Sequence, residues 1–402
     1  MMQRFVHKIL ESKALIFIAI FALVSLGSCC KSPPDIPVER SLLIYMAADS
    51  DLSAVSYSNI EMLKQGFLPK NGNIIIYHDP ADAPPRLFRL VKRGTEVVEE
   101  LIEQYAEENS ATPEVLTRCL LRMRELYPAE DYALILWSHA TGWVPSGTRV
   151  VFRASASFLD MDHPQVKTFG RDGRQEMELD QLVSAISAFP YRLSFVLFDA
   201  CLMGGIEVAY ALRNLTDWII ASPAEVIAEG FPYDQIMQPM FLPKPDLEKG
   251  LEEVCAAFYR FYNEKIGFNR TATVALYRTE ALPQLATSVK SIFEAHRDKV
   301  NTFVPTGLQY YDRLTSSPHL FYDLDHFIRQ VATSTEYEGF SQVFEKVVTY
   351  KQATPSLFPG LSYEIPIHHY GGISTYIPVG SQPTLREAYK KTDWNKAVGL
   401  LE

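Results

Sequence analysis

The sequence predicts an α/β fold in which a mostly parallel central sheet lies between two layers of helices. Continuous apolar runs rich in β-branched and aromatic residues are typical of parallel strands buried on both faces. Four such runs occur, at residues 41–48, 73–78, 132–138 and 193–200. Helical patterns such as 113–127 separate them. This alternation of strand and helix predicts an α/β/α sandwich.

The composition narrows the class of protein. The chain has 402 residues, of which 47% are apolar and 21% are charged, as in ordinary globular proteins. These values exclude a disordered chain, a collagen-like chain and a polytopic membrane protein. The net charge is −10, from 38 basic and 48 acidic residues. That balance argues against nucleic acid as a partner and leaves room for an acidic pocket that binds basic groups.

The first 28 residues predict export. Basic residues precede an apolar run at 14–26, which is shorter than the about 20 residues that span a bilayer and is typical of a secretory signal peptide. The run ends in Leu26-Gly27-Ser28-Cys29, which resembles a bacterial lipobox. We therefore expect cleavage before Cys29 and lipidation of that residue. The alternatives are plain secretion and cleavage before Cys30.

We expect a signal peptide at 1–28, an extended tether at 29–40, a first α/β unit at 41–240, and a C-terminal extension at 241–402 packed on that unit. The lipid would hold the protein at the membrane of the bacterial cell envelope; whether it faces the periplasm or the outer surface stays open. In the extension the pattern predicts helices at 247–264, 281–298, 323–333 and 338–351, and strands at 272–278 and 372–379.

The predicted strand at 193–200 is followed by a cysteine. In open α/β sheets, ligands bind outside the carboxyl ends of the strands. A helical pattern follows Cys201 at once, and the positive end of a helix dipole lowers the pKa of a thiol. Asp199 lies two residues earlier, on the same side of the strand. The alternative is a buried apolar Cys201, with Asp199 as a helix cap.

His139 ends the strand that we expect beside that of Cys201. A cysteine nucleophile needs a group that protonates the leaving amine, and the other histidines follow no comparable motif. The alternative for His139 is a structural imidazole.

The segments around these two residues, LILWSHATGW and FDACLMGGIEVAYALR, resemble the clostripain family of cysteine peptidases, which shares the caspase-like fold. The resemblance covers roughly residues 41–380. It implies a caspase-like sandwich, Cys201 as the nucleophile and His139 as the second member of the dyad. It also implies cleavage after Arg or Lys, the P1 residue of the substrate. Further matches are YMAADSDL, ASPAEVIAEGFPYD, ATVALYRTE, YDLDHF and GGISTYIP.

The resemblance also places a substrate pocket. A P1 guanidinium is best bound by a carboxylate in bidentate contact, and Asp199 stands where the family has its pocket acid. Ser222 and Glu225 match a hydroxyl and an acid that line the same pocket. The alternative for these two residues is a capping box, because Ser-x-x-Glu is also a helix-start signature.

Ala140 departs from the family, which usually has glycine after the histidine. The N–H of this residue, with that of Cys201, is implied to bind the oxyanion. If the backbone needs a positive φ here, alanine costs about 1 kcal/mol, and a lost donor lowers the rate by about 10²–10³. The alternative function is therefore a catalytically weak or inactive clostripain-like lipoprotein that binds peptides or partners.

The resemblance carries two further expectations. The basic residues of 144–192 offer sites for self-processing of a monomer into two chains. No cofactor is required and no metal site is predicted from the spacing of residues. Some members respond to calcium, for which Asp49, Asp51 and Asp172 offer oxygens.

Overall fold

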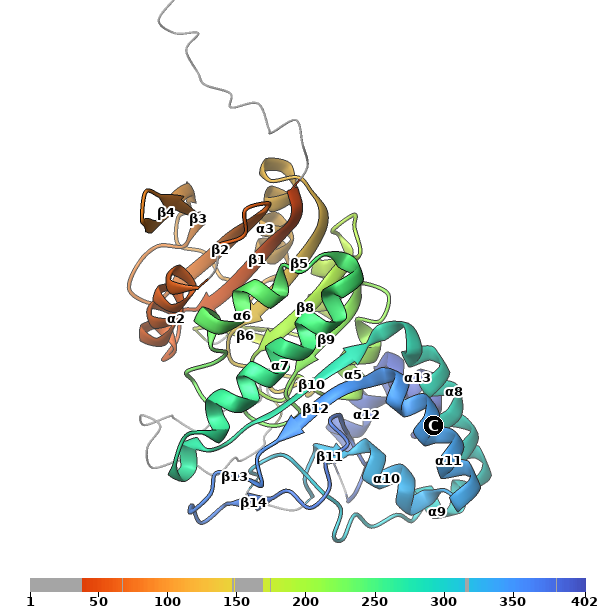
Figure 1. Ribbon diagram of the computed structural model, residues 1–402. Coiled ribbons are helices and arrows are strands. Elements are labelled where there is room, and N and C mark those ends of the chain that lie inside the picture. Colours follow the sequence, from red (N-terminus) through yellow and green to blue (C-terminus); the bar gives the residue numbers. More distant parts are fainter. Residues whose placement is uncertain are drawn as a thin grey trace, which may run out of the picture. The chain divides into compact units, whose positions relative to one another are not determined.

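The computed structural model describes residues 38–402, apart from 67, 147, 149–168, 174, 315–317 and 381. A nine-stranded sheet runs through it in the order β12-β10-β9-β8-β5-β1-β2-β3-β4 (Figure 1). Its five central strands, from β9 to β2, are parallel, and an antiparallel pair extends each edge. The strands are β1 (Val38–Ala48), β2 (Gly72–Pro80), β3 (Arg86–Arg93), β4 (Glu96–Gln104), β5 (Ala129–Trp137), β8 (Leu193–Asp199), β9 (Thr216–Ala221), β10 (Thr273–Arg278) and β12 (Val348–Ala353).

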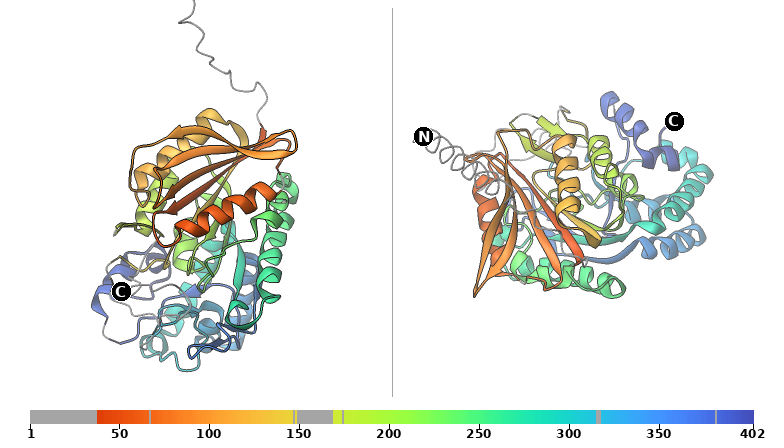
Figure 2. Two further views of the ribbon diagram at one scale, coloured as in Figure 1. Left: turned by 90° about the vertical axis from the view of Figure 1, so that its left-hand side faces the viewer. Right: turned by 90° about the horizontal axis from the view of Figure 1, so that it is seen from above.

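Helices cover both faces of the sheet, as the view from above shows (Figure 2). Because strand side chains alternate between faces, β1 sends Leu43 and Tyr45 into one apolar core and Leu42 and Ile44 into the other. The second core is closed by α2 (Ser53–Gln65), α6 (Tyr233–Met240) and α7 (Leu247–Asn263). The first is closed by α3 (Pro113–Leu126), α4 (Leu179–Ser187), α5 (Ile206–Ala211), α8 (Leu282–Ala295), α9 (Arg297–Asn301), α10 (Leu324–Val331), α11 (Ser334–Val347), α12 (Pro383–Lys391) and α13 (Asp393–Val398). The predicted α/β/α sandwich is confirmed.

The order of the parallel strands defines where a ligand should bind. From β1 the chain first adds β2 on one side, and later adds β5, β8 and β9 on the other. The carboxyl ends of β1 and β5 therefore flank a topological switch point, the usual ligand crevice of an open α/β sheet.

Some predicted elements differ from the structure. The helix expected at 338–351 ends at Val347, and the chain continues as β12. β-Branched and aromatic residues at 347–350 explain the change, because they favour a strand. The late strand expected at 372–379 is reduced to β15 (Ser374–Thr375). The connection at 139–192 contains β6 (Phe169–Asp172), β7 (Gln175–Met177) and α4.

The ends of the predicted units compare with the structure as follows. β1 begins at Val38, so the last three residues of the expected tether belong to the sheet. The extension beyond residue 240 adds β10 and β12 to the same sheet. The signal peptide, Cys29 and the basic residues of 149–168 lie outside the described residues. None of the helices described reaches the length and apolarity that a membrane crossing requires.

Candidate active site

His139 and Cys201 follow neighbouring parallel strands. Trp137 on β5 pairs with Asp199 on β8, and the N–H of Ser138 donates to the Asp199 carbonyl at 3.4 Å. His139 and Cys201 each come two residues after this pair. Because adjacent strands lie about 4.8 Å apart, this register places the two residues at neighbouring strand ends.

Asp51 adds a third side chain, which the sequence had suggested only as a calcium ligand. Its Oδ1 lies 2.9 Å from Nε2 of His139, and it follows β1, the strand on the other side of β5. The order Cys201–His139–Asp51 thus follows the order β8-β5-β1, and the His139–Asp51 pair spans the switch point. The signal in the sequence was the acidic stretch 49–51 directly after a buried strand at the same sheet edge.

The backbone after Cys201 forms a tight turn rather than a helix. Leu202 has φ of 61°, a left-handed conformation that is unfavourable for a side chain of this kind. A Cβ at Gly204 would lie 2.4 Å from the Pro223 nitrogen, so only glycine fits there. Helix α5 begins at Ile206, so the prediction that the Cys201 thiol lies at a helix N-terminus is wrong. Residues 202–204 form this turn, in which the N–H groups of Leu202 and Gly204 donate to the carbonyls of Ala224 and Ser222.

Cys201 contacts the segment that follows β9. Its Sγ receives the N–H of Val226 at 3.3 Å and donates to the Val226 carbonyl at 3.5 Å. The side chain is half-buried, whereas Cys119 and Cys255 are buried, and burial raises the pKa of both buried thiols strongly. Among the described cysteines, Cys201 is therefore the one suited to nucleophilic attack.

Ala140 is not strained. Leu202 and Phe358 are the non-glycine residues with positive φ in the described part of the chain. Ala140 forms an isolated bridge with Phe169, in which Gly170 donates to the His139 carbonyl at 2.9 Å. In this antiparallel bridge the hydrogen bond joins the neighbours His139 and Gly170 and not the paired residues themselves. The N–H of Ala140 therefore points away from Phe169. No acceptor contacts it within the described ranges, as an oxyanion donor requires.

Asp199 is buried, and one of its oxygens is engaged. Oδ2 accepts the N–H of Phe231 at 3.1 Å and the Tyr233 hydroxyl at 2.8 Å. Burial raises the pKa of Asp199 to about 6, while the hydrogen bonds from Tyr233 and Phe231 lower it. No donor among the described residues contacts Oδ1. Asp199 and Cys201 both face the segment 226–233.

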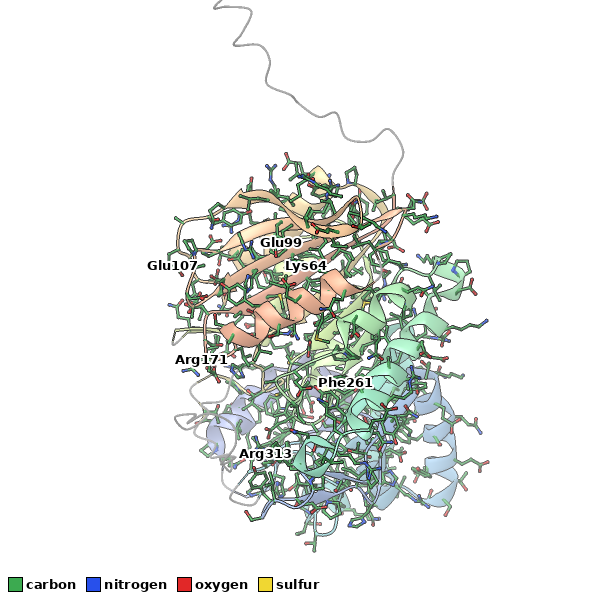
Figure 3. The ribbon with its side chains drawn as sticks, turned by 60° about the vertical axis from the view of Figure 1, so that its left-hand side comes forward. Lys64, Glu99, Glu107, Arg171, Phe261 and Arg313 are labelled. Carbon is green, nitrogen blue, oxygen red and sulfur yellow. The ribbon has the colours of Figure 1, made fainter. Side chains whose placement is uncertain are left out.

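Ser222 and Glu225 already have internal partners. The Ser222 hydroxyl lies 2.7 Å from that of Thr273 and accepts the N–H of Ala224. Glu225 forms a two-point ion pair with Arg313, whose Nε donates to Oε1 at 2.8 Å. No helix begins at 222–229, so the capping-box alternative is wrong. Arg313 comes from the stretch between α9 and β11 (Tyr322–Asp323) (Figure 3).

Three aspartates gather beside the same sheet edge. Asp79 is the last residue but one of β2 and is fully buried. Burial raises the pKa of its carboxylate, and the Ser110 hydroxyl beside it lowers that pKa, although neither group makes a hydrogen bond of good geometry to a described residue. Burial raises the pKa of Asp79 to about 7 and that of Asp172 to about 6, and the charge of Asp49 adds to both shifts. The three carboxylates are thus electrostatically coupled, and a cation nearby would relieve their mutual repulsion.

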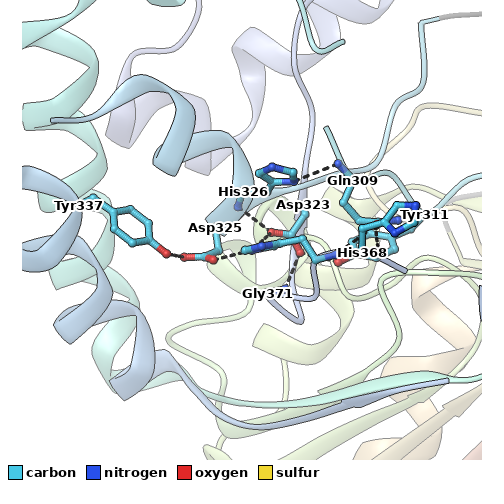
Figure 4. A network of polar contacts seen from close by, with 9 residues as sticks. Gln309, Tyr311, Asp323, Asp325, His326, Tyr337, His368 and Gly371 are labelled. Carbon is cyan, nitrogen blue, oxygen red and sulfur yellow. Dashed lines mark hydrogen bonds and ion pairs between the residues drawn. The ribbon is translucent and has the colours of Figure 1, made fainter. Parts of the chain in front are cut away.

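A second polar cluster lies in the C-terminal region (Figure 4). Ligand atoms of Asp323, Asp325 and His369 lie within 4.8 Å of one another. Asp325 contacts Nε2 of His369 at 2.6 Å and the Tyr337 hydroxyl at 2.9 Å. Asp323 accepts hydrogen bonds from the Tyr311 hydroxyl and from the backbone N–H groups of His326 and Gly371. The carboxylates are thus satisfied by the protein itself.

Two cavities lie elsewhere. One of about 550 Å³ lies between α3 and α4. The other, of about 410 Å³, is lined by residues of 304–310, 318–326 and 365–368. Neither of these two cavities is lined by His139 or Cys201.

Comparisons with known proteins identify the family and agree with the fold. The sequence profile of the Clostripain family matches residues 44–378. Clostripain of Hathewaya histolytica is 25% identical over 225 residues, which cover 49% of this chain and 41% of that protein. The match thus spans about two fifths of this curated relative.

Solved structures extend the likeness. An inactive zymogen C11 protease from Parabacteroides distasonis is 34% identical with a TM-score of 0.77, and the match covers 90% of this chain and 99% of that one. Iotapain, a secreted C11 cysteine protease from Bacteroides thetaiotaomicron, is 26% identical with a TM-score of 0.77 and the same coverage. With the profile matching most of the chain, this protein belongs to the clostripain family of cysteine peptidases.

Proposed function

We propose that this chain is a cysteine endopeptidase that cleaves after Arg or Lys through a Cys201/His139 dyad. The observation that carries the proposal is the register of β5 and β8, which brings His139 and Cys201 to adjacent strand ends. The contact between His139 and Asp51 supports it. Family membership supports the peptidase reaction, and the acid beside the nucleophile supports the basic P1 residue.

The reaction follows from these positions. The Cys201 thiolate attacks the scissile carbonyl carbon, and the N–H of Ala140 stabilises the oxyanion. Asp51 holds Nε2 of His139, so Nδ1 is the nitrogen that exchanges protons at the scissile bond. Its proton goes to the leaving amine as the C–N bond breaks. His139 then accepts a proton from water, whose oxygen attacks the thioester and releases the carboxylic acid and the thiol.

Asp199 is the carboxylate that we assign to the P1 side chain. Its Oδ1 offers one acceptor in a buried setting, where a charge-assisted hydrogen bond is strong. Because the pKa of Asp199 is raised to about 6, the carboxylate ionises only as the pH rises through that value. We therefore expect kcat/KM for Arg and Lys substrates to rise between about pH 5 and 7.

Calcium, which the family resemblance suggests, fits the three aspartates beside the sheet edge and not the cluster of Figure 4. In Figure 4 the carboxylates already accept protein hydrogen bonds, and histidine is a poor ligand for a hard cation. Asp79 and Ser110 have buried oxygens that make no hydrogen bond of good geometry with the described residues, and Asp49 and Asp172 lie next to them. A cation there would neutralise repulsion between the carboxylates. We expect CaCl₂ to raise Tm in the wild type and not in Asp79→Asn.

The remaining proposals concern export and maturation. We propose that Cys29 is lipidated at the bacterial envelope, and that the chain, a monomer, is cut within 144–192. Secretion of iotapain and the zymogen state of the Parabacteroides relative support these proposals. Metabolic labelling with a fatty acid tests the first, and loss of label in Cys29→Ala is the expected result. For the cut within 144–192, we expect the wild type to give two bands on a denaturing gel and Cys201→Ala to give one.

The proposed activity is tested on the chain from Lys31 onward with fluorogenic Arg, Lys, Asp and Ala substrates, with Cys201→Ala as control, and with calcium and reductant varied. We expect cleavage after Arg or Lys that the control lacks, and selective labelling of Cys201 by an arginine chloromethylketone. Cleavage only after Asp or Ala would contradict the assignment of Asp199. If the cut chain shows no turnover and is not labelled, the proposed peptidase activity is contradicted. The alternative of an inactive binding protein depended on strain at Ala140, which the structure does not show.

A further inference from the structure

The Glu225–Arg313 ion pair lies beside the nucleophile. Glu225 directly precedes Val226, whose N–H and carbonyl contact the Cys201 thiol. Burial lowers the pKa of Arg313, but the negative charges of Glu225 and of the Cys201 thiolate raise it. Arg313 is therefore near enough to the thiol for the two charges to interact.

Arg313 makes the contacts that a P1 arginine would make. Its guanidinium engages both oxygens of Glu225, the bidentate geometry that distinguishes Arg from Lys. The rings of Phe358 and Tyr363 lie 4.6 and 5.2 Å from it. Only 12% of the Arg313 side chain and 14% of that of Glu225 are exposed. A substrate side chain cannot reach this carboxylate while Arg313 holds it.

We propose that Arg313 is a specificity-determining residue, an internal guanidinium that withholds Glu225 from the substrate and leaves the P1 side chain to Asp199. This inference rests on the proposed function. Asp199 has one oxygen engaged by Tyr233 and Phe231, so it offers a single acceptor. A single acceptor removes the bidentate advantage of arginine, and the enzyme accepts Lys at P1 as readily as Arg.

Loss of the Arg313 charge should then change the preference for P1. In Arg313→Gln, Glu225 becomes available to a substrate guanidinium, and the ratio of kcat/KM for Arg over Lys should rise about tenfold, the worth of one further charge-assisted hydrogen bond. The double variant Arg313→Gln/Glu225→Gln removes the freed carboxylate and should return the ratio to the wild-type value.

A matched control is available in Arg278. It holds both oxygens of Glu248, at 2.6 and 2.7 Å, and joins α7 to the end of β10. Arg278→Gln should leave the Arg/Lys ratio unchanged. If Arg313→Gln does not fold, Arg313→Lys keeps the charge but loses the two-point contact, and it should raise the ratio by a smaller factor.

The following outcomes would overturn the proposal. An equal loss of kcat/KM on all substrates in Arg313→Gln, with a shifted pH profile of Cys201 alkylation by iodoacetamide, would make Arg313 a residue that tunes the thiol. A raised ratio that persists in the double variant would exclude Glu225 as the acceptor.

Benzamidine, a small amidinium cation, separates this proposal from the proposed function. It should stabilise Arg313→Gln against heat more than it stabilises the wild type or the double variant, and this thermal shift needs no turnover. An inactive wild type with such a shift would contradict the peptidase reaction but support the role of Arg313. An active wild type, together with no added benzamidine stabilisation in Arg313→Gln, would support the peptidase reaction and contradict the role of Arg313.

Discussion

Three histidines in the described part of the chain contact an aspartate, and two of these pairs, His139–Asp51 and His369–Asp325, differ in their chemical settings. Nε2 of His139 lies 2.9 Å from Asp51, and Nε2 of His369 lies 2.6 Å from Asp325. By distance alone the second pair is the better one. Yet His369 belongs to a closed network in which tyrosine hydroxyls and backbone N–H groups satisfy the carboxylates (Figure 4).

Position in the sheet separates the two pairs. His139 and Asp51 follow the strands that flank the topological switch point, and Cys201 follows the next strand. The His369 network has no thiol among its described members. A His–Asp pair therefore indicates catalysis only where the fold places a nucleophile beside it, and elsewhere it indicates a structural ion pair.

The largest expected effect separates the two histidines directly. Cys201→Ala should abolish turnover, and His139→Gln should lower kcat by about 10²–10⁴, the usual contribution of general acid–base catalysis. His369→Gln, the matched change in the other pair, should leave kcat within about twofold. Steady-state kinetics at 25 °C on folded variants, checked by circular dichroism, measures both. Similar losses in His139→Gln and His369→Gln would remove the distinction between the pairs.

The two aspartates give the next effect. Asp51→Asn should lower kcat about tenfold or more with KM nearly unchanged, because the amide orients His139 less well and does not stabilise its imidazolium. The basic limb of the pH–rate profile should move to lower pH. Asp325→Asn should leave both readouts unchanged. Partial recovery in Asp51→Glu would mark a positioning role, whereas an unchanged kcat in Asp51→Asn would exclude one.

The sequence predicted the sheet better than the site. Short apolar runs rich in β-branched and aromatic residues favour buried strands, so β1, β2, β5 and β8 were found close to their true bounds. The residues of the proposed dyad follow from those strand ends and from the resemblance. The partners of Glu225 and Ser222 could not be predicted, because Arg313 and Thr273 are far away in the chain. The turn after Cys201 was missed because its residues also fit a helical pattern.

A smaller effect concerns stability. The hydrogen bond to Asp325 raises the pKa of His369, so its stabilisation is complete below the ordinary value of about 6.5 and is lost as the pH rises through the raised value. For Asp325, burial raises the pKa, but the hydrogen bonds from His369 and Tyr337 together with the nearby positive charges lower it by more, so this contribution is lost in acid. We expect His369→Gln to lower the free energy of unfolding by about 1–3 kcal/mol near pH 6. Denaturation from pH 5 to 9 should show this difference shrinking at high pH, and a constant difference would contradict it.

The smallest effect tests the residue that follows His139, the histidine of the proposed dyad. Ala140 has an ordinary φ, so the glycine usual in the family should bring no relief of strain. We expect Ala140→Gly to change kcat by less than about threefold and to lower stability by about 0.5–1 kcal/mol, through the added freedom of the unfolded chain. Its matched control is Tyr370→Phe, after the other histidine, which should leave kcat unchanged. A rise in kcat of tenfold or more in Ala140→Gly would show that alanine holds the oxyanion donor away from the scissile carbonyl. That result would make the departure from the family a brake on catalysis rather than a neutral exchange.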